Sequence, residues 1–255
     1  MKKNFLLCLL FSLVIFTWTS CGTDKKETVQ EGQNEALEQD EEESSAVAFE
    51  KHEVMAYPDA IIEMYSPLGN ENFDVGRVPF EFNIKNYPFN EGLKGFQFRV
   101  SFNGNNPIGF NLPIFQREFN SGAYRVVAYL IDREGLALKE FGNYVDRDFT
   151  VGESQPFPES NEPYMILNLP LEGQTYSGEE ELIVDYLLIG GGLKEDGLKV
   201  IVEVNGQQHE VTELSAITVK NLPPGKHEVK VSLVKRGGDQ LDGIFTTAKR
   251  SVTIN

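Results

Sequence analysis

Hydrophobic and polar residues alternate in short runs along most of the chain. Every second residue is apolar between residues 78 and 84, and again between residues 96 and 102. A period of two residues is that of a β-strand with one buried face and one solvated face. Segments with the three-to-four-residue spacing of an amphipathic helix are absent from the pattern. The alternation therefore predicts an all-β fold.

The strand pattern occurs twice along the chain. The segment that begins at Gly95 aligns with the segment that begins at Gly197, at an offset of 102 residues. Residues 121–126 align in the same way with residues 224–229, at an offset of 103. Self-similarity of this kind is the sequence signature of a duplicated structural unit. The chain therefore contains two copies of one fold.

The copies are separated by a short segment rich in Pro, Ser and Glu, residues 153–162. Such a composition is typical of a linker. We therefore predict a first domain over residues 55–152 and a second over residues 163–255. Six or seven short strands in about 90 residues, with turn residues between them, indicate a β-sandwich in each.

A shared motif identifies the type of sandwich. In each copy a glycine stands two residues before Tyr124 or His227, and a valine, Val126 or Val229, stands two residues after. This motif resembles strand F of the immunoglobulin and fibronectin type III folds, in which a corner tyrosine bonds back to the backbone. The resemblance implies two tandem immunoglobulin-like domains, with His227 at the corner position of the second. The valines stand where antibody domains have a cysteine, which implies relatives without a disulfide.

The start of the chain follows a different pattern. A run of fourteen apolar and small residues, 5–18, follows two lysines and ends shortly before Cys21. The run is short for a membrane span, and the basic residues before it are typical of an export signal. The segment resembles the signal peptide of bacterial lipoproteins, although Trp18 stands where that family has a small aliphatic residue. The resemblance implies that residues 1–20 are removed and that Cys21 carries the lipid.

This resemblance also implies a location. The protein would be held in the cell envelope by its acylated N-terminus, on the membrane and not across it. Under the enteric sorting rule, Gly22 after the cysteine implies the outer membrane. Whether the body faces the periplasm or the cell surface is left open.

Residues 21–54 are expected to form the lipidated cysteine and an unstructured tether. They contain few core-forming residues and include the acidic run 40–43, a composition that does not bury enough apolar surface to fold. The whole chain has a formal charge of −16. With no stripe of Lys and Arg in the body, nucleic acid is excluded as a partner.

Catalytic chemistry finds little support. The three histidines, His52, His209 and His227, stand in separate places, which argues against a metal cluster or a base–nucleophile pair. Cys8 lies in the signal, so the exported chain has no pair of thiols for a disulfide. We predict no enzyme, no metal and no cofactor.

A calcium site near the linker is a candidate metal site. Asp146 and Asp148 lie on one strand face near the linker, where Glu153 or Glu159 could join them. Calcium needs six to eight oxygen ligands from a shaped loop, and none is evident. Solvated charges at a sheet edge are therefore favoured.

Two segments of the first domain are more apolar than turns require. One carries Tyr87 and Phe89, and the other carries Phe110 and Leu112, whereas the matching segment of the second domain, residues 207–212, is polar. Apolar loops are either buried or used for binding. We predict these four residues as a partner-binding site. The alternative is that Phe89 and Phe110 cap the core of the first domain.

A further contact is predicted in the second domain, in a loop expected over residues 186–193 that turns back toward the first domain. Alternation directs Leu188 inward, and Leu187 and Ile189 outward. Because an outward aliphatic pair near a domain joint favours burial, we predict an interdomain contact there.

These observations predict a non-catalytic, membrane-anchored lipoprotein that presents immunoglobulin-like domains to a protein or envelope partner. The alternative is a glycan-binding accessory lipoprotein of the cell surface, which would use exposed aromatic side chains.

Overall fold

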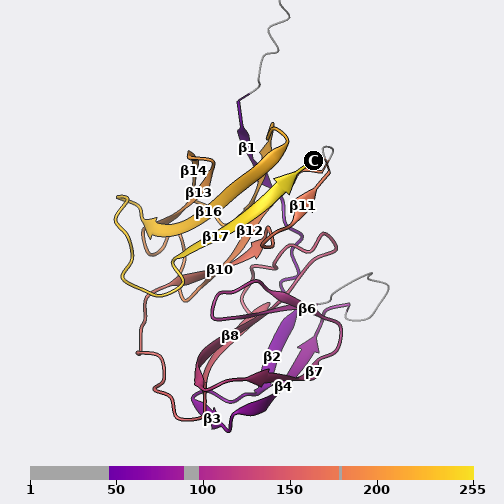
Figure 1. Cartoon of the computed structure of the whole chain (residues 1–255), viewed down its shortest axis with the longest axis vertical. Helices are drawn as coiled ribbons and strands as arrows, with labels where there is room; N and C mark the ends of the chain where they lie inside the picture. Colours follow the sequence, from indigo (N-terminus) through magenta and orange to yellow (C-terminus); the bar gives the residue numbers. More distant parts are fainter. Residues whose placement is uncertain (1–45, 89–97, 178–179) are drawn as a thin grey trace, which may run out of the picture. The chain divides into compact units, whose positions relative to one another are not determined.

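The computed structural model describes residues 46–88, 98–177 and 180–255, and its regular elements are all strands (Figure 1). The strands are β1 (Ala48–His52), β2 (Ile61–Ser66), β3 (Glu71–Phe73), β4 (Gly76–Lys85), β5 (Phe98–Phe102), β6 (Ile108–Phe110), β7 (Ile114–Phe119), β8 (Gly122–Leu130), β9 (Tyr144–Val151), β10 (Tyr164–Leu169), β11 (Thr175–Tyr176), β12 (Leu182–Ile189), β13 (Leu198–Val204), β14 (Gln207–Val211), β15 (Ala216–Lys220), β16 (Gly225–Lys235) and β17 (Thr247–Ile254).

The two copies have the same strand order. Strands β2–β9 form sandwich 1, with sheets β2-β4-β7 and β3-β9-β8-β5-β6. Strands β10–β17 form sandwich 2, with sheets β10-β12-β15 and β11-β17-β16-β13-β14. In each copy the first strand pairs with one sheet, and a short continuation (β3 or β11) then pairs in parallel with the last strand of the other sheet. This is the immunoglobulin-like topology that the motif implied.

The cores differ in composition. Both sandwiches bury the inward face of each sheet, as alternation predicts. Sandwich 1 is filled largely by phenylalanine rings: Phe80, Phe82, Phe98, Phe102, Phe119 and Phe149. Sandwich 2 is filled mainly by aliphatic side chains, among them Val184, Val200, Val202, Val204, Val229 and Val231.

The corner motif is present in both copies. The Tyr124 hydroxyl donates to the carbonyl oxygen of Asn120 at 3.0 Å. In sandwich 2, Nε2 of His227 lies 2.7 Å from the carbonyl oxygen of Pro223, also four residues earlier. Nδ1 of the same ring lies 2.6 Å from the side-chain amide nitrogen of Asn205. The predicted structural role of His227 is confirmed.

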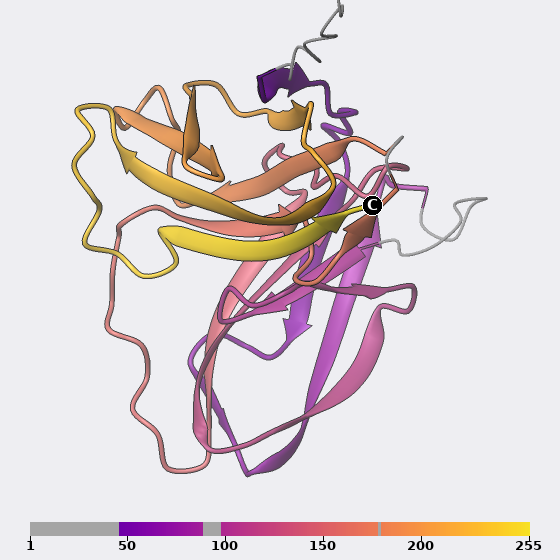
Figure 2. The same ribbon diagram turned by 45° about the horizontal axis from the view of Figure 1, so that its top comes forward.

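The prediction of an unstructured tether over residues 21–54 is wrong at its C-terminal end. Ala48–His52 form β1, which pairs antiparallel with β15 and adds a fourth strand to a sheet of sandwich 2 (Figures 1 and 2). Phe49 packs against the core of sandwich 2 and stacks on His209 with ring centroids 5.2 Å apart. Two apolar side chains, Val47 and Phe49, and a partner strand about 170 positions away supply what the local composition lacks. Residues 21–45 lie outside the described residues.

Candidate functional site

The predicted partner-binding residues have different environments. Tyr87 is half-buried against the core of sandwich 1, and its hydroxyl donates to the carbonyl oxygen of Ile131. Burial raises the pKa of Tyr87 to about 12. Phe110 is also half-buried, with its ring 3.8 Å from that of Phe115 in a stacked arrangement. Both side chains therefore pack against the core of sandwich 1.

The remaining two residues differ again. The Leu112 side chain is 63% exposed, in the connection between β6 and β7. Phe89 lies outside the described residues. Phe110 and Leu112 thus lie at the end of β6 and just after it, whereas Tyr87 is hydrogen-bonded to Ile131. A binding role for the four residues stays a prediction.

A second set of residues joins the two sandwiches. Outward residues of β8 and of the turn that follows it in sandwich 1, together with residues of β10 and β12 in sandwich 2, form one buried apolar cluster. Its buried members are Val127, Tyr129, Ile131, Ala137, Tyr164, Ile166, Leu187 and Ile189. The sheets therefore meet face to face through aliphatic and aromatic side chains. We call this cluster, with the polar contacts described next, the joint.

The joint confirms the interdomain contact predicted at Leu187 and Ile189. Both side chains are buried in it, at 1% and 4% exposure, whereas Leu188 belongs to the core of sandwich 2. The segment was expected to be a loop, and here the prediction is wrong, since residues up to Ile189 continue β12. A regular strand explains why alternation assigned the three side chains correctly.

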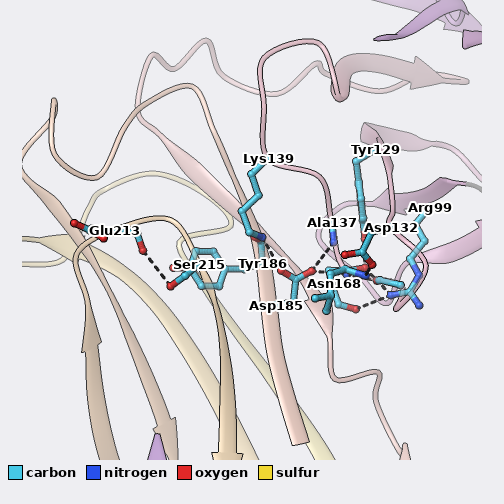
Figure 3. Close-up of polar contacts among 12 residues, drawn as sticks. Arg99, Tyr129, Asp132, Ala137, Lys139, Asn168, Asp185, Tyr186, Glu213 and Ser215 are labelled. Carbon is cyan, nitrogen blue, oxygen red and sulfur yellow. Dashed lines mark hydrogen bonds and ion pairs between the residues drawn. The ribbon is translucent and has the colours of Figure 1, made fainter. Parts of the chain in front are cut away.

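Asp185 is the charged centre of the joint (Figure 3). Its carboxylate is fully buried and accepts hydrogen bonds from Nζ of Lys139 at 2.6 Å and from the backbone nitrogen of Ala137 at 2.7 Å, both in sandwich 1. The side-chain amide of Asn168 donates a third, at 2.6 Å. A buried carboxylate is stable only when it is paired in this way.

Asn168 extends the network into sandwich 1. Its side-chain oxygen accepts from the Tyr129 hydroxyl at 2.9 Å and from the Arg99 guanidinium at 2.6 Å. Its amide also donates to the carbonyl oxygen of Gly135 at 2.9 Å. Burial raises the pKa of Tyr129 well above its usual range, so the phenol stays a donor. Because these groups satisfy one another, the polar contacts of the joint favour this arrangement of the two sandwiches.

β1 adds a contact across the joint. Nδ1 of His52 lies 3.0 Å from the Thr218 hydroxyl in β15, and Nε2 lies 3.1 Å from the Glu134 carboxylate in sandwich 1. The strand that precedes sandwich 1 in sequence therefore belongs to sandwich 2 and touches both.

The two carboxylates near the linker are bonded to protein groups, whereas the sequence favoured solvated charges. Asp148 accepts two hydrogen bonds from Arg125, each 2.6 Å long, and this pairing raises the pKa of the guanidinium. Asp146 accepts from the Tyr164 hydroxyl at 2.9 Å. Arg125 also lies 5.7 Å from the ring centroid of Phe157 in the linker. Within the described ranges, no group of three or more His, Cys, Asp or Glu side chains is placed to share a metal ion.

The linker covers a cavity beside this ion pair. The cavity has a volume of about 580 Å³ and is lined by Asn70, Arg125, Asp148, Thr150, Phe157 and Glu159, among others. Two phenylalanine side chains, Phe149 and Phe157, and several hydrogen-bonding side chains thus line one space. Cavities of a few hundred Å³ with a few convergent polar groups are the usual form of small-ligand sites.

Sequence reasoning missed the polar part of the joint, although a signal existed. Asn168 interrupts the otherwise apolar run Tyr164–Leu169, and Asp185 interrupts Leu182–Ile189. A polar residue in a buried strand needs a partner.

Cys21 lies outside the described residues, and the part of the chain that is described contains no helix long and apolar enough to cross a membrane.

Comparisons with known proteins find similar solved structures but no family. The chain matches no protein-family model and no curated protein. Similar solved structures include the fibronectin(III)-like modules of Clostridium thermocellum CbhA, at 14% identity and a TM-score of 0.29, with 76% of this chain and 94% of that chain covered. Immunoglobulin domains 1–4 of Sidekick-1 match at 9% identity and a TM-score of 0.26, with 77% of this chain and 51% of that chain covered. Because both TM-scores are low, the immunoglobulin-like fold rests on the strand order of this chain.

Proposed function

We propose that this protein is a non-catalytic lipoprotein of the cell envelope, anchored through Cys21, that presents its two sandwiches as one rigid body to a protein partner. The observation that carries the proposal is the joint. Asp185 is buried and bonded to both sandwiches, so the surfaces of the two copies keep a fixed relation. Recognition sites are more precise on rigid elements than on independently moving ones.

The position of β1 supports a particular mode of attachment. The carbonyl oxygen of Ala46 accepts a hydrogen bond from the side chain of Asn221, so the chain from Cys21 enters the body at sandwich 2. Cys21 to Ala46 is a stretch of 26 residues, and a flexible coil of that length would have a root-mean-square end-to-end distance of about 25–30 Å. We infer that the lipid holds the body by sandwich 2. The side of sandwich 1 that carries β6 and β7 is then free for a partner.

The anchor is tested by Cys21→Ser. Metabolic labelling with a radioactive or alkynyl fatty acid should mark the parent chain and not the variant, and the variant should leave the detergent phase in a phase-partition assay. A variant that is still labelled would contradict the anchor.

The interaction is tested by crosslinking in native membranes. The parent chain should recover a defined protein partner, and Asp185→Ala, which unlocks the joint, should recover at least fivefold less. If the parent chain recovers no protein, or if both chains recover the same amount, the rigid-platform proposal is contradicted.

The cavity under the linker favours a second candidate, glycan binding. Sugars are held by aromatic faces together with planar hydrogen-bonding side chains, and Phe157, Arg125 and Asn70 line the cavity. A neutral saccharide fits a site in which Arg125 is already neutralised by Asp148. Binding on a glycan array that is lost in Phe157→Ala, and kept in Phe141→Ala at an exposed ring outside the cavity lining, would favour this candidate over the protein-binding one.

A further inference from the structure

Corresponding edges of the two sandwiches are occupied differently. In sandwich 2, β15 pairs with β12 on one side and with β1 on the other. In sandwich 1, β7 pairs with β4, and no other strand of the described residues lies on its outer side. An edge strand with unpaired backbone groups is a template for a further strand.

The register shows which residues correspond. Phe80 pairs with Phe115 on β7, and Val184 pairs with Ile217 on β15. Phe80 stands two residues before Phe82, which pairs with β2. Val184 likewise stands two residues before Tyr186, which pairs with β10. The corresponding edges are therefore Ile114–Glu118 and Ala216–Lys220.

The backbone of β7 has hydrogen-bonding groups to offer. The backbone nitrogen of Phe82 donates to the carbonyl oxygen of Pro113 at 2.9 Å, so the odd-numbered residues of this strand bond to β4. Antiparallel ladders alternate, and the even-numbered residues point their N–H and C=O groups outward. Ile114, Gln116 and Glu118 thus present three donors and three acceptors.

Exposed apolar side chains and the cation of Arg117 lie around this edge, beside the exposed polar side chains of Gln116 and Glu118. Leu112 and Ile114 are each 63% exposed, and Ile108 on the neighbouring sheet is 38% exposed. The Arg117 guanidinium lies 4.8 Å from the ring centroid of Phe102, and it has no carboxylate partner among the described residues. Exposed apolar side chains beside free backbone groups mark a binding surface better than either feature alone.

Sandwich 2 shows how such an edge is filled. Phe49 of β1 lies opposite Val219 and stacks on His209, which pairs with Val202. In sandwich 1, Ile108 takes the place of His209, because it pairs with Val100 in the same way. An aromatic residue opposite Arg117, the counterpart of Val219, would therefore lie beside Ile108 and close to the cation.

We propose that the β7 edge binds an extended segment of a partner protein, antiparallel to β7, with an aromatic residue opposite Arg117 and an aliphatic residue opposite Phe115. Backbone hydrogen bonds give such strand addition its affinity, and the two inward side chains give it specificity. The aromatic ring gains a cation–π contact with Arg117. That the occupant belongs to a protein partner rests on the proposed function.

The chain's own β1 is not this occupant. It is held on β15 by Phe49 and by the Glu50–Lys220 ion pair, whose atoms are 2.7 Å apart. Moving it to β7 would only exchange one unpaired edge for another.

The test uses a blocked peptide, Ser-Ala-Phe-Glu-Val-Thr-Ser, and the chain from residue 21 onward with Cys21→Ser. Titration followed by backbone amide NMR should shift Ile114, Gln116 and Glu118 first. Gln116→Pro removes an outward N–H that β4 does not use, so the edge is blocked without loss of a ladder bond. It should weaken the peptide at least tenfold, whereas Gln116→Ala, which keeps the N–H, should leave the dissociation constant within twofold.

Ile108→Asp provides a second variant outside β7, and it should weaken the peptide at least fivefold. The proposal is overturned if the peptide causes no shifts at β7, if binding survives Gln116→Pro, or if the shifts map to β15 with release of β1. Concentration-dependent pairing of two chains through β7, abolished by Gln116→Pro, would also overturn it in favour of self-association. Fatty-acid labelling of Cys21 and crosslinking of the parent chain test the proposed function separately, so either can fail alone.

Discussion

Sandwich 1 and sandwich 2 share one strand order but close their hydrophobic cores by different means. Sandwich 1 fills its interior with phenylalanine rings and stacks Phe110 on Phe115 at its open side. Sandwich 2 uses aliphatic residues, with Val211 in the place of Phe110, and covers the same side with Phe49 from β1. A duplicated fold can thus keep its topology while the closing side chain comes from inside the unit or from a distant segment.

The two sandwiches also differ in how many of their surfaces are covered by other parts of the chain. Sandwich 2 is engaged on two sides, by β1 and by the joint. Sandwich 1 is engaged by the joint and has its β7 edge unpaired within the described residues. The first copy in sequence is therefore the more open of the two, although β1, which precedes it, serves the second.

The strongest way to break the relation between the copies is Asp185→Ala. The change leaves Lys139 and Asn168 buried without their shared acceptor. Removing one partner of a buried ion pair costs about 3–5 kcal/mol of unfolding free energy. Urea unfolding should show this loss and a split into two transitions. A single transition, with an unfolding free energy within about 1 kcal/mol of that of the parent chain, would mean that the joint does not lock the two sandwiches together.

The different closing side chains can be compared with Phe110→Ala and Val211→Ala. Phe110 is half-buried, so its loss should cost about 2 kcal/mol, less than the 3–5 kcal/mol of a fully buried ring. Val211 is buried but smaller, and its loss should cost about 1.5 kcal/mol at roughly 0.8 kcal/mol per carbon. Thermal unfolding measures both. An unchanged melting temperature for Phe110→Ala, together with lost partner capture, would instead assign Phe110 to binding.

The contribution of β1 is measured by Phe49→Ala. Phe49 packs on the core of sandwich 2 from one edge, so its loss should cost about 1–2 kcal/mol. Glu53→Ala, at an exposed position just after β1, is the matched control and should change stability by less than about 0.5 kcal/mol. Equal effects of the two substitutions would show that β1 is not anchored through Phe49.

The smallest effect concerns Asp132, in the turn of sandwich 1 beside the joint. Burial raises the pKa of this carboxyl above its ordinary value of 3.8. The folded state then binds more protons than the unfolded chain, so the free energy of unfolding falls as the pH rises through the window above 3.8.

Asp132→Asn tests this effect, because its amide oxygen can still accept from the backbone nitrogens of Glu134 and Leu136, both at 2.9 Å. The variant should be slightly more stable than the parent at pH 7 and not at pH 3, as measured by urea unfolding. A variant that is less stable at pH 7 would show that the carboxylate is needed in its charged form.

The sequence predicted features that depend on local periodicity. Alternation placed Leu187 and Ile189 outward and Leu188 inward, and the glycine-to-valine motif identified the corners at Tyr124 and His227. These signals lie within a few residues of each other, and strand geometry carries them directly into space.

What the sequence did not reveal depends on residues far apart. β1 contains one core residue, Phe49, and its strand exists because β15 offers an edge. The Asp185–Lys139 pair joins residues 46 positions apart in different domains. Pairings of this kind leave no local period, although a polar residue within an apolar run does point to a missing partner.

Hydrogen exchange at two amides tests the central claim, that one copy's edge is open and the other's is filled. Gln116 on β7 and Thr218 on β15 occupy matching outward positions. In the free chain, the Gln116 amide should exchange at least a hundredfold faster than the Thr218 amide, because β1 covers Thr218. Equal protection of both amides would show that the β7 edge is already covered, and it would contradict the account of how the two copies differ.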